Sequence, residues 1–191
     1  MTYIPREPTR PETAAGRPPK FRLRTVLVAG LVGAVALAYL RGRVIDVVVV
    51  QGKSMVPTFA DGSRLLAWQG RYQPGDLKRG EIVLLYDPTD GTLVVKRVIG
   101  LGGDTLVYSG KQVWVDGELL DEPYVNRGGP LTLQRGWVIV PRDAVFVMGD
   151  NRGNSQDSRD YGTVRIGKIR GRPFAALWPP SEWGRGQRAV R

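Results

Sequence analysis

The chain of 191 residues contains neither cysteine nor histidine. Without cysteine it cannot form disulfide bonds, thiolate metal sites or a cysteine nucleophile. Without histidine it cannot form a Ser-His-Asp triad, and most zinc sites are excluded as well. If the protein is a hydrolase that uses a serine nucleophile, its general base must therefore be a lysine, an aspartate or a glutamate.

Positive charge is concentrated at the N-terminal end. Residues 1–43 hold eight of the 28 basic residues but only two of the 18 acidic ones, so the remainder of the chain is only mildly basic. Residues 1–19 are rich in proline, threonine and charge and have no apolar period. This composition predicts a disordered arm, because such a segment cannot bury enough apolar surface to fold.

The one long apolar segment, residues 25–40, has basic residues on both sides. Its 16 uncharged residues are fewer than the roughly 20 that usually span a bilayer. Phe21, Leu23 and arginines that reach toward the headgroups can lengthen the span. We expect residues 20–43 to form a single transmembrane signal anchor. The alternatives are a cleaved secretory signal, indicated by the Ala-x-Ala spacing of "AVALA", and a buried helix of a soluble protein.

The charges that flank this segment also predict its orientation. Because basic residues outnumber acidic ones before it, the arm is expected in the cytoplasm and the chain from residue 44 onward outside it. The prediction is a single-pass protein of the plasma (inner) membrane, with an extracytoplasmic domain at residues 44–180 and a basic tail at 181–191. An oxidising compartment also suits a chain that has no thiols.

After residue 43 the sequence has the pattern of β-strands. Short apolar runs rich in β-branched residues alternate with turn signals, among them "PTDG", Ser109-Gly110 and Asp116-Gly117. The four valines at residues 47–50 predict a buried strand, and no long amphipathic helix follows them. We therefore predict an antiparallel all-β domain.

Two polar residues stand out in this β pattern. Ser54 follows the four valines closely, and Lys96 lies inside an apolar strand, where a period of two places it on one face with Val94 and Val98. Burial lowers a lysine pKa by up to about 3–5 units, which makes the neutral amine a competent general base for a serine hydroxyl. A lysine that reaches solvent and a serine that ends a strand are the purely structural alternatives.

Three segments resemble, in sequence and in order, the motif boxes of the type I (leader) signal peptidases. They are "GKSMVPTF" at residues 52–59, "VVKRVIGLGGD" at 94–104 and "VFVMGDNRGNSQDSRDYG" at 145–162. The resemblance covers about residues 20–180. It implies an all-β catalytic domain of the signal-peptidase/LexA-like fold, preceded by one transmembrane helix.

The same resemblance implies an activity and partners. The protein would be a serine endopeptidase that removes signal peptides from exported preproteins after small residues at positions −1 and −3, through an acyl-enzyme. Its partners would be preproteins and the lipid bilayer, with no nucleic acid. Neither a metal nor a cofactor would be needed.

The resemblance also implies roles for individual residues. Ser54 falls on the nucleophile, Lys96 on the general base, and Ser155 on the serine whose hydroxyl orients the lysine amine. The backbone N–H of Ser54 would donate to the oxyanion. Many members carry Ser or Thr where this chain has Gly52, so one side-chain oxyanion donor is missing here. The charged residues expected to brace the site by ion pairing are Arg97, Asp150, Asp157 and Arg159.

Two rival functions follow from other features of the sequence. A self-cleaving repressor of the LexA type would use the same Ser/Lys chemistry, but it would need a DNA-binding helix pair where this chain has an apolar segment. A membrane-anchored β-domain that binds an anionic polymer or lipid would use the basic C-terminal segment, residues 165–191. Salt-sensitive binding without peptidase activity would favour the second rival.

Overall fold

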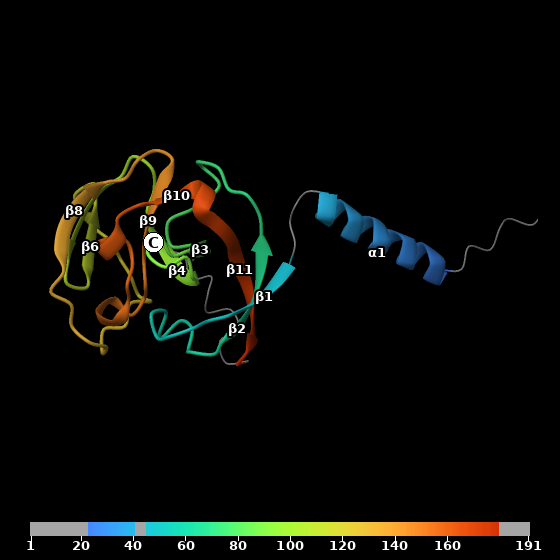
Figure 1. Ribbon diagram of the computed structural model, residues 1–191, viewed down its shortest axis with the longest axis horizontal. Coiled ribbons are helices and arrows are strands. Elements are labelled where there is room, and N and C mark those ends of the chain that lie inside the picture. Colours follow the sequence, from blue (N-terminus) through green and yellow to red (C-terminus); the bar gives the residue numbers. More distant parts are fainter. Residues whose placement is uncertain (1–22, 41–44, 180–191) are drawn as a thin grey trace, which may run out of the picture. The chain divides into compact units, whose positions relative to one another are not determined.

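The computed structural model describes residues 23–40 and 45–179 (Figure 1). The predicted arm at residues 1–19 and the predicted tail at 181–191 lie outside the described residues. The chain divides into two compact units, Met1–Leu37 and Ala38–Arg191.

Helix α1 (Leu23–Leu40) forms where the sequence has an apolar run without proline. Its apolar side chains face all directions, and Leu27, Leu31 and Val35 are each more than half exposed. Within residues 23–40 and 45–179, no helix combines the length and the hydropathy that crossing a bilayer requires. The transmembrane anchor at residues 20–43 therefore stays a prediction.

The described part of the second unit is built from two antiparallel sheets (Figure 1), which confirms the predicted all-β domain. The larger sheet has the strand order β1-β2-β11-β3-β4-β9-β10, and the smaller sheet has the order β7-β6-β5-β8. The strands are β1 (Ile45–Val49), β2 (Arg64–Gln69), β3 (Ile82–Tyr86), β4 (Leu93–Gly100), β5 (Thr105–Ser109), β6 (Gln112–Val115), β7 (Glu118–Leu119), β8 (Arg135–Ile139), β9 (Ala144–Met148), β10 (Val164–Arg165) and β11 (Ile169–Trp178).

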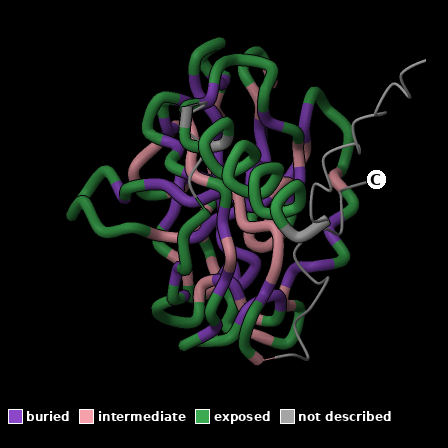
Figure 2. Tube along the Cα trace, turned by 90° about the vertical axis from the view of Figure 1, so that its right-hand side faces the viewer, coloured by how far each residue is buried: buried purple, intermediate pink, exposed green. Residues whose placement is uncertain are grey.

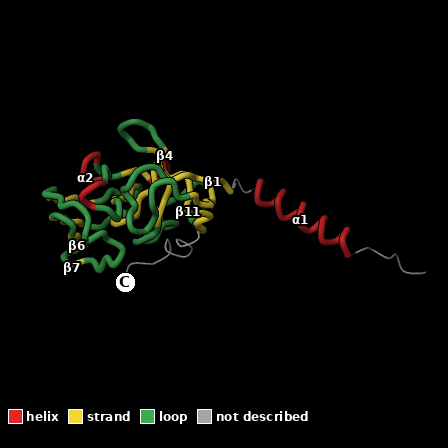
Figure 3. The backbone as a smooth tube through the Cα atoms, turned by 90° about the horizontal axis from the view of Figure 1, so that it is seen from below, coloured by secondary structure: helices red, strands yellow, loops and turns green. Residues whose placement is uncertain are grey.

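Among the described residues after 43, helical structure is confined to short turns, as Figure 3 shows. The longest is the single turn α2 (Ser158–Tyr161), which follows β9 and a 3-10 turn, η1 (Arg152–Asn154). A second 3-10 turn, η2 (Ile166–Lys168), precedes β11. The described residues after 43 therefore agree with the prediction that no long amphipathic helix is present.

The predicted hairpin turns are present, one of them displaced by a residue. Asp116 and Gly117 connect β6 to β7 with φ angles of 50° and 89°, which are the positive values that a tight two-residue hairpin needs. The other prediction was wrong by one position. Ser109 still belongs to β5, so the loop consists of Gly110 and Lys111.

The four valines form an edge strand and its continuation, and the prediction of a buried strand was wrong. Val48 and Val50 are buried, whereas Val47 and Val49 are about half exposed, at 51% and 49%. β1 is the outermost strand of the larger sheet, and the alternating burial shows that only one of its faces is covered. Figure 2 shows how buried, intermediate and exposed segments are distributed along the chain, and β9, near the other edge of the sheet, is buried throughout.

The C-terminal segment is a structural element for much of its length. β11 lies between β2 and β3 near the middle of the larger sheet. Residues 169–178 are therefore part of the sheet and not of a free end, although Arg170 is exposed. The rival interpretation of residues 165–191 as a basic surface stays a prediction.

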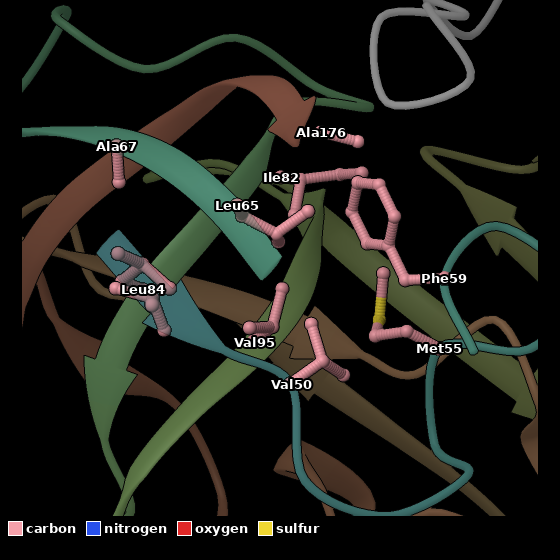
Figure 4. Close-up of a cluster of buried hydrophobic side chains, with 10 residues drawn as sticks. Val50, Met55, Phe59, Leu65, Ala67, Ile82, Leu84, Val95 and Ala176 are labelled. Carbon is pink, nitrogen blue, oxygen red and sulfur yellow. The ribbon is translucent and has the colours of Figure 1, made fainter. Parts of the chain in front are cut away.

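One cluster of the core lies directly beneath the turn that carries Ser54 (Figure 4). Met55 is fully buried and packs in a cluster with Phe59, Val50 and Val95. Because the residue that follows Ser54 is held in the core, the turn after β1 has a fixed position over the sheet. Burying a side chain of this size contributes roughly 1.5–3 kcal/mol.

Candidate active site

Lys96 lies in the middle of β4, between β3 and β9. It pairs with Val83 across the sheet and is only 3% exposed, which confirms its predicted burial. Burial lowers the pKa of the Lys96 amine below its ordinary value, and this effect outweighs the opposing influence of Asp157 and Asp87. The site therefore contains an amine that is biased toward its neutral form.

Ser155 holds this amine. The Lys96 Nζ lies 3.0 Å from the Ser155 Oγ, at the position expected for a hydroxyl that orients the lysine. Ser155 directly follows η1, in the loop between β9 and α2. The two residues are 59 positions apart in the sequence, so the contact depends on this loop closing over β4.

Gly149 allows the turn that carries Ser54 to lie close to Lys96 and Ser155. A Cβ atom on Gly149 would lie 2.6 Å from the Ser54 carbonyl oxygen and would also collide with the Ser155 Oγ. Because no side chain fits there, the backbone of the Ser54 turn can approach the Lys96–Ser155 pair. The Asn151 N–H then donates to the Ser54 carbonyl at 2.9 Å and fixes the turn against the loop.

Gly52 has a backbone conformation that favours glycine. Its φ is 81°, in the left-handed region, although a Cβ there would meet no heavy atom within 4 Å. Its N–H donates to the Asp61 Oδ1 at 2.8 Å. The absence of a Ser or Thr hydroxyl at this position is thus accompanied by a turn geometry that a side chain would strain.

Arg97 and Asp150 form a buried ion pair beside Lys96. The Arg97 Nη2 lies 2.7 Å from the Asp150 Oδ2, and both side chains are almost completely inaccessible. The Thr58 hydroxyl also donates to Asp150, and the Arg97 guanidinium lies 3.8 Å from the centre of the Tyr124 ring. The pair therefore connects β4, the loop after β9 and the segment that follows Ser54.

Asp157 and Arg159 form an ion pair where the loop after β9 meets α2. The Arg159 Nε lies 2.8 Å from the Asp157 Oδ1, and Asp157 also accepts a hydrogen bond of 3.0 Å from the Gly149 N–H. Burial acts to raise the pKa of Asp157, but the hydrogen bonds and charge of Arg159 outweigh it and hold the pKa below its usual value. Asp157 is also the N-cap of α2, where it forms a capping box with Asp160.

Sequence reasoning missed several residues of this network. A third buried ion pair joins Arg152 to Glu122 at 2.5 Å, and the Tyr124 hydroxyl donates to the same carboxylate at 2.8 Å. Glu122 and Tyr124 lie in an irregular segment that has no periodic pattern. Thr58 and Arg152 do lie within the motif boxes, so the boxes were the only signal that could have pointed to them.

The arrangement combines a serine turn, a buried amine biased toward neutrality and a hydroxyl that holds it, braced by two ion pairs. An amine in this state can accept a proton from a nearby hydroxyl, which is the requirement for general-base catalysis without histidine.

Comparison with known proteins gives one consistent result. The family described as signal peptidase, peptidase S26, matches residues 23–178. A probable signal peptidase I-2 of Synechocystis is 39% identical over 157 residues, which cover 78% of this chain and 71% of that protein. The signal peptidase I of Bacillus caldolyticus is 36% identical over 160 residues, with coverages of 78% and 87%.

Among solved structures, a signal peptidase I from Enterococcus faecalis is similar at 30% identity with a TM-score of 0.45, and the match covers 51% of this chain and 96% of that chain. The family match spans most of the chain and includes the Ser54 turn, β4 and the loop after β9. The chain therefore belongs to the signal peptidase family, peptidase S26, and is a serine endopeptidase.

Proposed function

We propose that this protein removes N-terminal signal peptides from exported preproteins, with Ser54 as nucleophile and Lys96 as general base. The observation that carries the proposal is the buried Lys96 amine, 3.0 Å from the Ser155 Oγ and next to the Ser54 turn. A chain without histidine or cysteine needs such an amine to activate a serine.

In the proposed reaction, neutral Lys96 accepts the Ser54 hydroxyl proton as the Ser54 Oγ attacks the scissile carbonyl. The negative charge on the carbonyl oxygen is stabilised by backbone N–H groups, including that of Ser54. Collapse of the tetrahedral intermediate breaks the peptide bond, and Lys96 returns the proton to the leaving amine. A water molecule then attacks the acyl-enzyme carbonyl while Lys96 accepts one of its protons. Lys96 passes this proton to the Ser54 Oγ as the ester bond breaks, which restores the free serine. Ser155 holds the amine in position throughout.

The substrate segment before the cleavage site would bind in extended form beside β4, which carries Lys96, and the turn that carries Ser54. Shallow apolar pockets would accept small side chains at positions −1 and −3.

The apolar α1 segment and its basic flanks support a single-pass anchor in the plasma (inner) membrane, with the N-terminus cytoplasmic. Ser54 follows Leu40 by 14 residues, so the site would lie close to the outer surface of the bilayer, where signal peptides emerge.

This proposal is tested with the purified full chain in detergent or vesicles and a preprotein that has an Ala-x-Ala site. We expect a single cut directly after the second alanine, identified by N-terminal sequencing of the product. A matched preprotein with Leu at −1 should be cleaved at least about 100-fold more slowly, because a pocket for a methyl group rejects a larger side chain. Equal cleavage of both substrates would contradict the proposed specificity.

The pH dependence of cleavage follows from the state of Lys96. Protonated Lys96 cannot accept a proton, so kcat/KM should rise with pH as the amine loses its proton. Because burial lowers the pKa of Lys96, the rise should be centred below the ordinary lysine value. The control is Lys78→Met, which replaces an exposed lysine and should leave the profile unchanged. A profile centred at or above the ordinary lysine pKa would contradict the role of Lys96.

A further inference from the structure

Asn151 contacts both carbonyl groups that flank the proposed nucleophile. Its side-chain Nδ2 donates to the Lys53 carbonyl at 3.0 Å, and its backbone N–H donates to the Ser54 carbonyl at 2.9 Å. Asn151 is buried, at 5% exposure, and it comes from the loop after β9, far from the Ser54 turn in sequence. One residue therefore holds two successive peptide groups of the turn.

The contact with Lys53 constrains the Ser54 N–H. The Lys53 carbonyl and the Ser54 N–H belong to the same planar peptide group, in which they point in opposite directions. Fixing the direction of the carbonyl therefore fixes the direction of the N–H. In the proposed function this N–H donates to the oxyanion, and such a donor is effective only when it is already aimed at the place where the charge develops.

Within the turn, the Lys53 carbonyl accepts one further and longer hydrogen bond, of 3.3 Å, from the Val56 N–H. Gln51, Gly52 and Lys53 are all exposed, and Gly52 has the widest choice of backbone conformations. Gly52 also brings no side-chain hydroxyl that could serve as a second oxyanion donor. The orientation of the backbone donor therefore matters more in this chain than it would with Ser or Thr at position 52.

The amide of Asn151 is itself oriented by a neighbour. The Asn126 Nδ2 lies 3.4 Å from the Asn151 Oδ1, and the Asn126 N–H donates to the Asp150 carbonyl at 2.9 Å. With its oxygen facing Asn126, the Asn151 amide turns its NH₂ group toward the Lys53 carbonyl, which can only accept.

We infer that Asn151 is a positioning residue for the oxyanion site: its side-chain amide sets the plane of the Lys53–Ser54 peptide and so aims the Ser54 N–H at the developing charge. The inference rests on the proposed function. It predicts an effect confined to the transition state, because Asn151 donates to the backbone of the turn and not to Lys96.

The test compares Asn151→Ala with Asn154→Ala, which removes the same kind of side chain from an exposed position in the same loop. Asn151→Ala should lower kcat by about 10- to 100-fold, less than the loss of a whole oxyanion donor, and should change KM by less than about threefold. The affinity for a peptide boronic acid, whose tetrahedral adduct occupies the oxyanion site, should fall in parallel with kcat. The midpoint of the pH–rate profile should stay where it is in the unmodified protein.

A second variant covers the case in which Asn151→Ala folds poorly. Asn151→Asp keeps the size of the side chain but turns an acceptor toward the Lys53 carbonyl, so kcat and boronate affinity should fall as for the alanine variant. Unchanged kcat in a folded variant would overturn the inference. So would a rise in KM alone, or a loss of kcat without any loss of boronate affinity, since these indicate a general effect on the loop.

The inference and the proposed function fail in different ways. If the unmodified protein does not cleave the preprotein, or if Ser54→Ala still cleaves it, the proposed function is wrong. If the unmodified protein cleaves and Ser54→Ala does not, while Asn151→Ala matches Asn154→Ala, only the inference is wrong.

Discussion

Replacing Ser54 by alanine, or Lys96 by methionine, is expected to lower preprotein cleavage by about four orders of magnitude or more. The first change removes the attacking oxygen. The second keeps most of the volume of the side chain but removes the amine that accepts the proton. Single-turnover assays with excess enzyme measure the effect, because they detect cleavage that is too slow for steady-state assays.

The matched controls replace residues of the same types on the surface. Ser109→Ala and Lys78→Met change an exposed serine and an exposed lysine, and both variants should cleave at the rate of the unmodified protein. If Lys96→Met retained more than about a tenth of the activity, Lys96 would not be the general base, whatever its burial.

The Lys96→Met variant should also change how the free energy of unfolding depends on pH. In the unfolded chain Lys96 has its ordinary pKa, whereas in the folded protein burial lowers it. Between these two values the unfolded state binds the extra proton, so the free energy of unfolding of the unmodified protein rises as pH increases through this window. Lys96→Met should lack this rise, and its free energy of unfolding should exceed that of the unmodified protein most clearly below the window. Urea titrations at a series of pH values measure the difference.

The second large effect is expected from Asp150→Ala. The change leaves Arg97 buried without a counter-charge and removes the acceptor of the Thr58 hydroxyl. Breaking a buried pair in this way costs about 3–5 kcal/mol in the free energy of unfolding. Activity should fall with it, because Arg97 and Asp150 join β4 to the loop that holds Ser155. Chemical denaturation followed by circular dichroism gives the free energy directly.

The control for this prediction is a pair of the same charges near the surface. Arg172 and Glu81 lie 3.2 Å apart with side-chain exposures of 32% and 28%. Glu81→Ala should change the free energy of unfolding by only about 0–1 kcal/mol, because solvent screens an exposed pair. If Asp150→Ala had as small an effect as Glu81→Ala, the Arg97–Asp150 pair would not brace the site.

The parts of the fold that were predicted correctly have local signals. β3 and β4 are apolar runs on either side of a turn sequence, and β6 and β7 surround Asp116-Gly117. β11 had no such signal. It contains Gly171 and Pro173, carries arginines, and changes register against both of its neighbours. Its place in the sheet comes from packing between β2 and β3, which single-sequence patterns do not report.

The site likewise combines features that have a local sequence signal with features that depend on long-range contacts. Burial of Lys96 could be inferred from the valines around it, whereas the roles proposed for Ser54 and Ser155 rest on the motif boxes and stay predictions. The hydrogen bond from Asn151 to the Lys53 carbonyl joins residues 98 positions apart, and the Arg152–Glu122 ion pair joins residues 30 positions apart. Contacts of this kind exist only after the loops have closed, so the residue types alone could not reveal them.

The position of β11 has a consequence for how the protein comes into being. β1 and β2 lie on one side of it, whereas β3, β4 and β9 lie on the other, so the last of the described strands joins two halves of the larger sheet. Ser54 lies in the first half, between β1 and β2, and Lys96 belongs to the second. A nascent chain that has not yet released residue 178 cannot complete the sheet that carries both. No proteolytic activity is therefore expected until residue 178 has been synthesised and released.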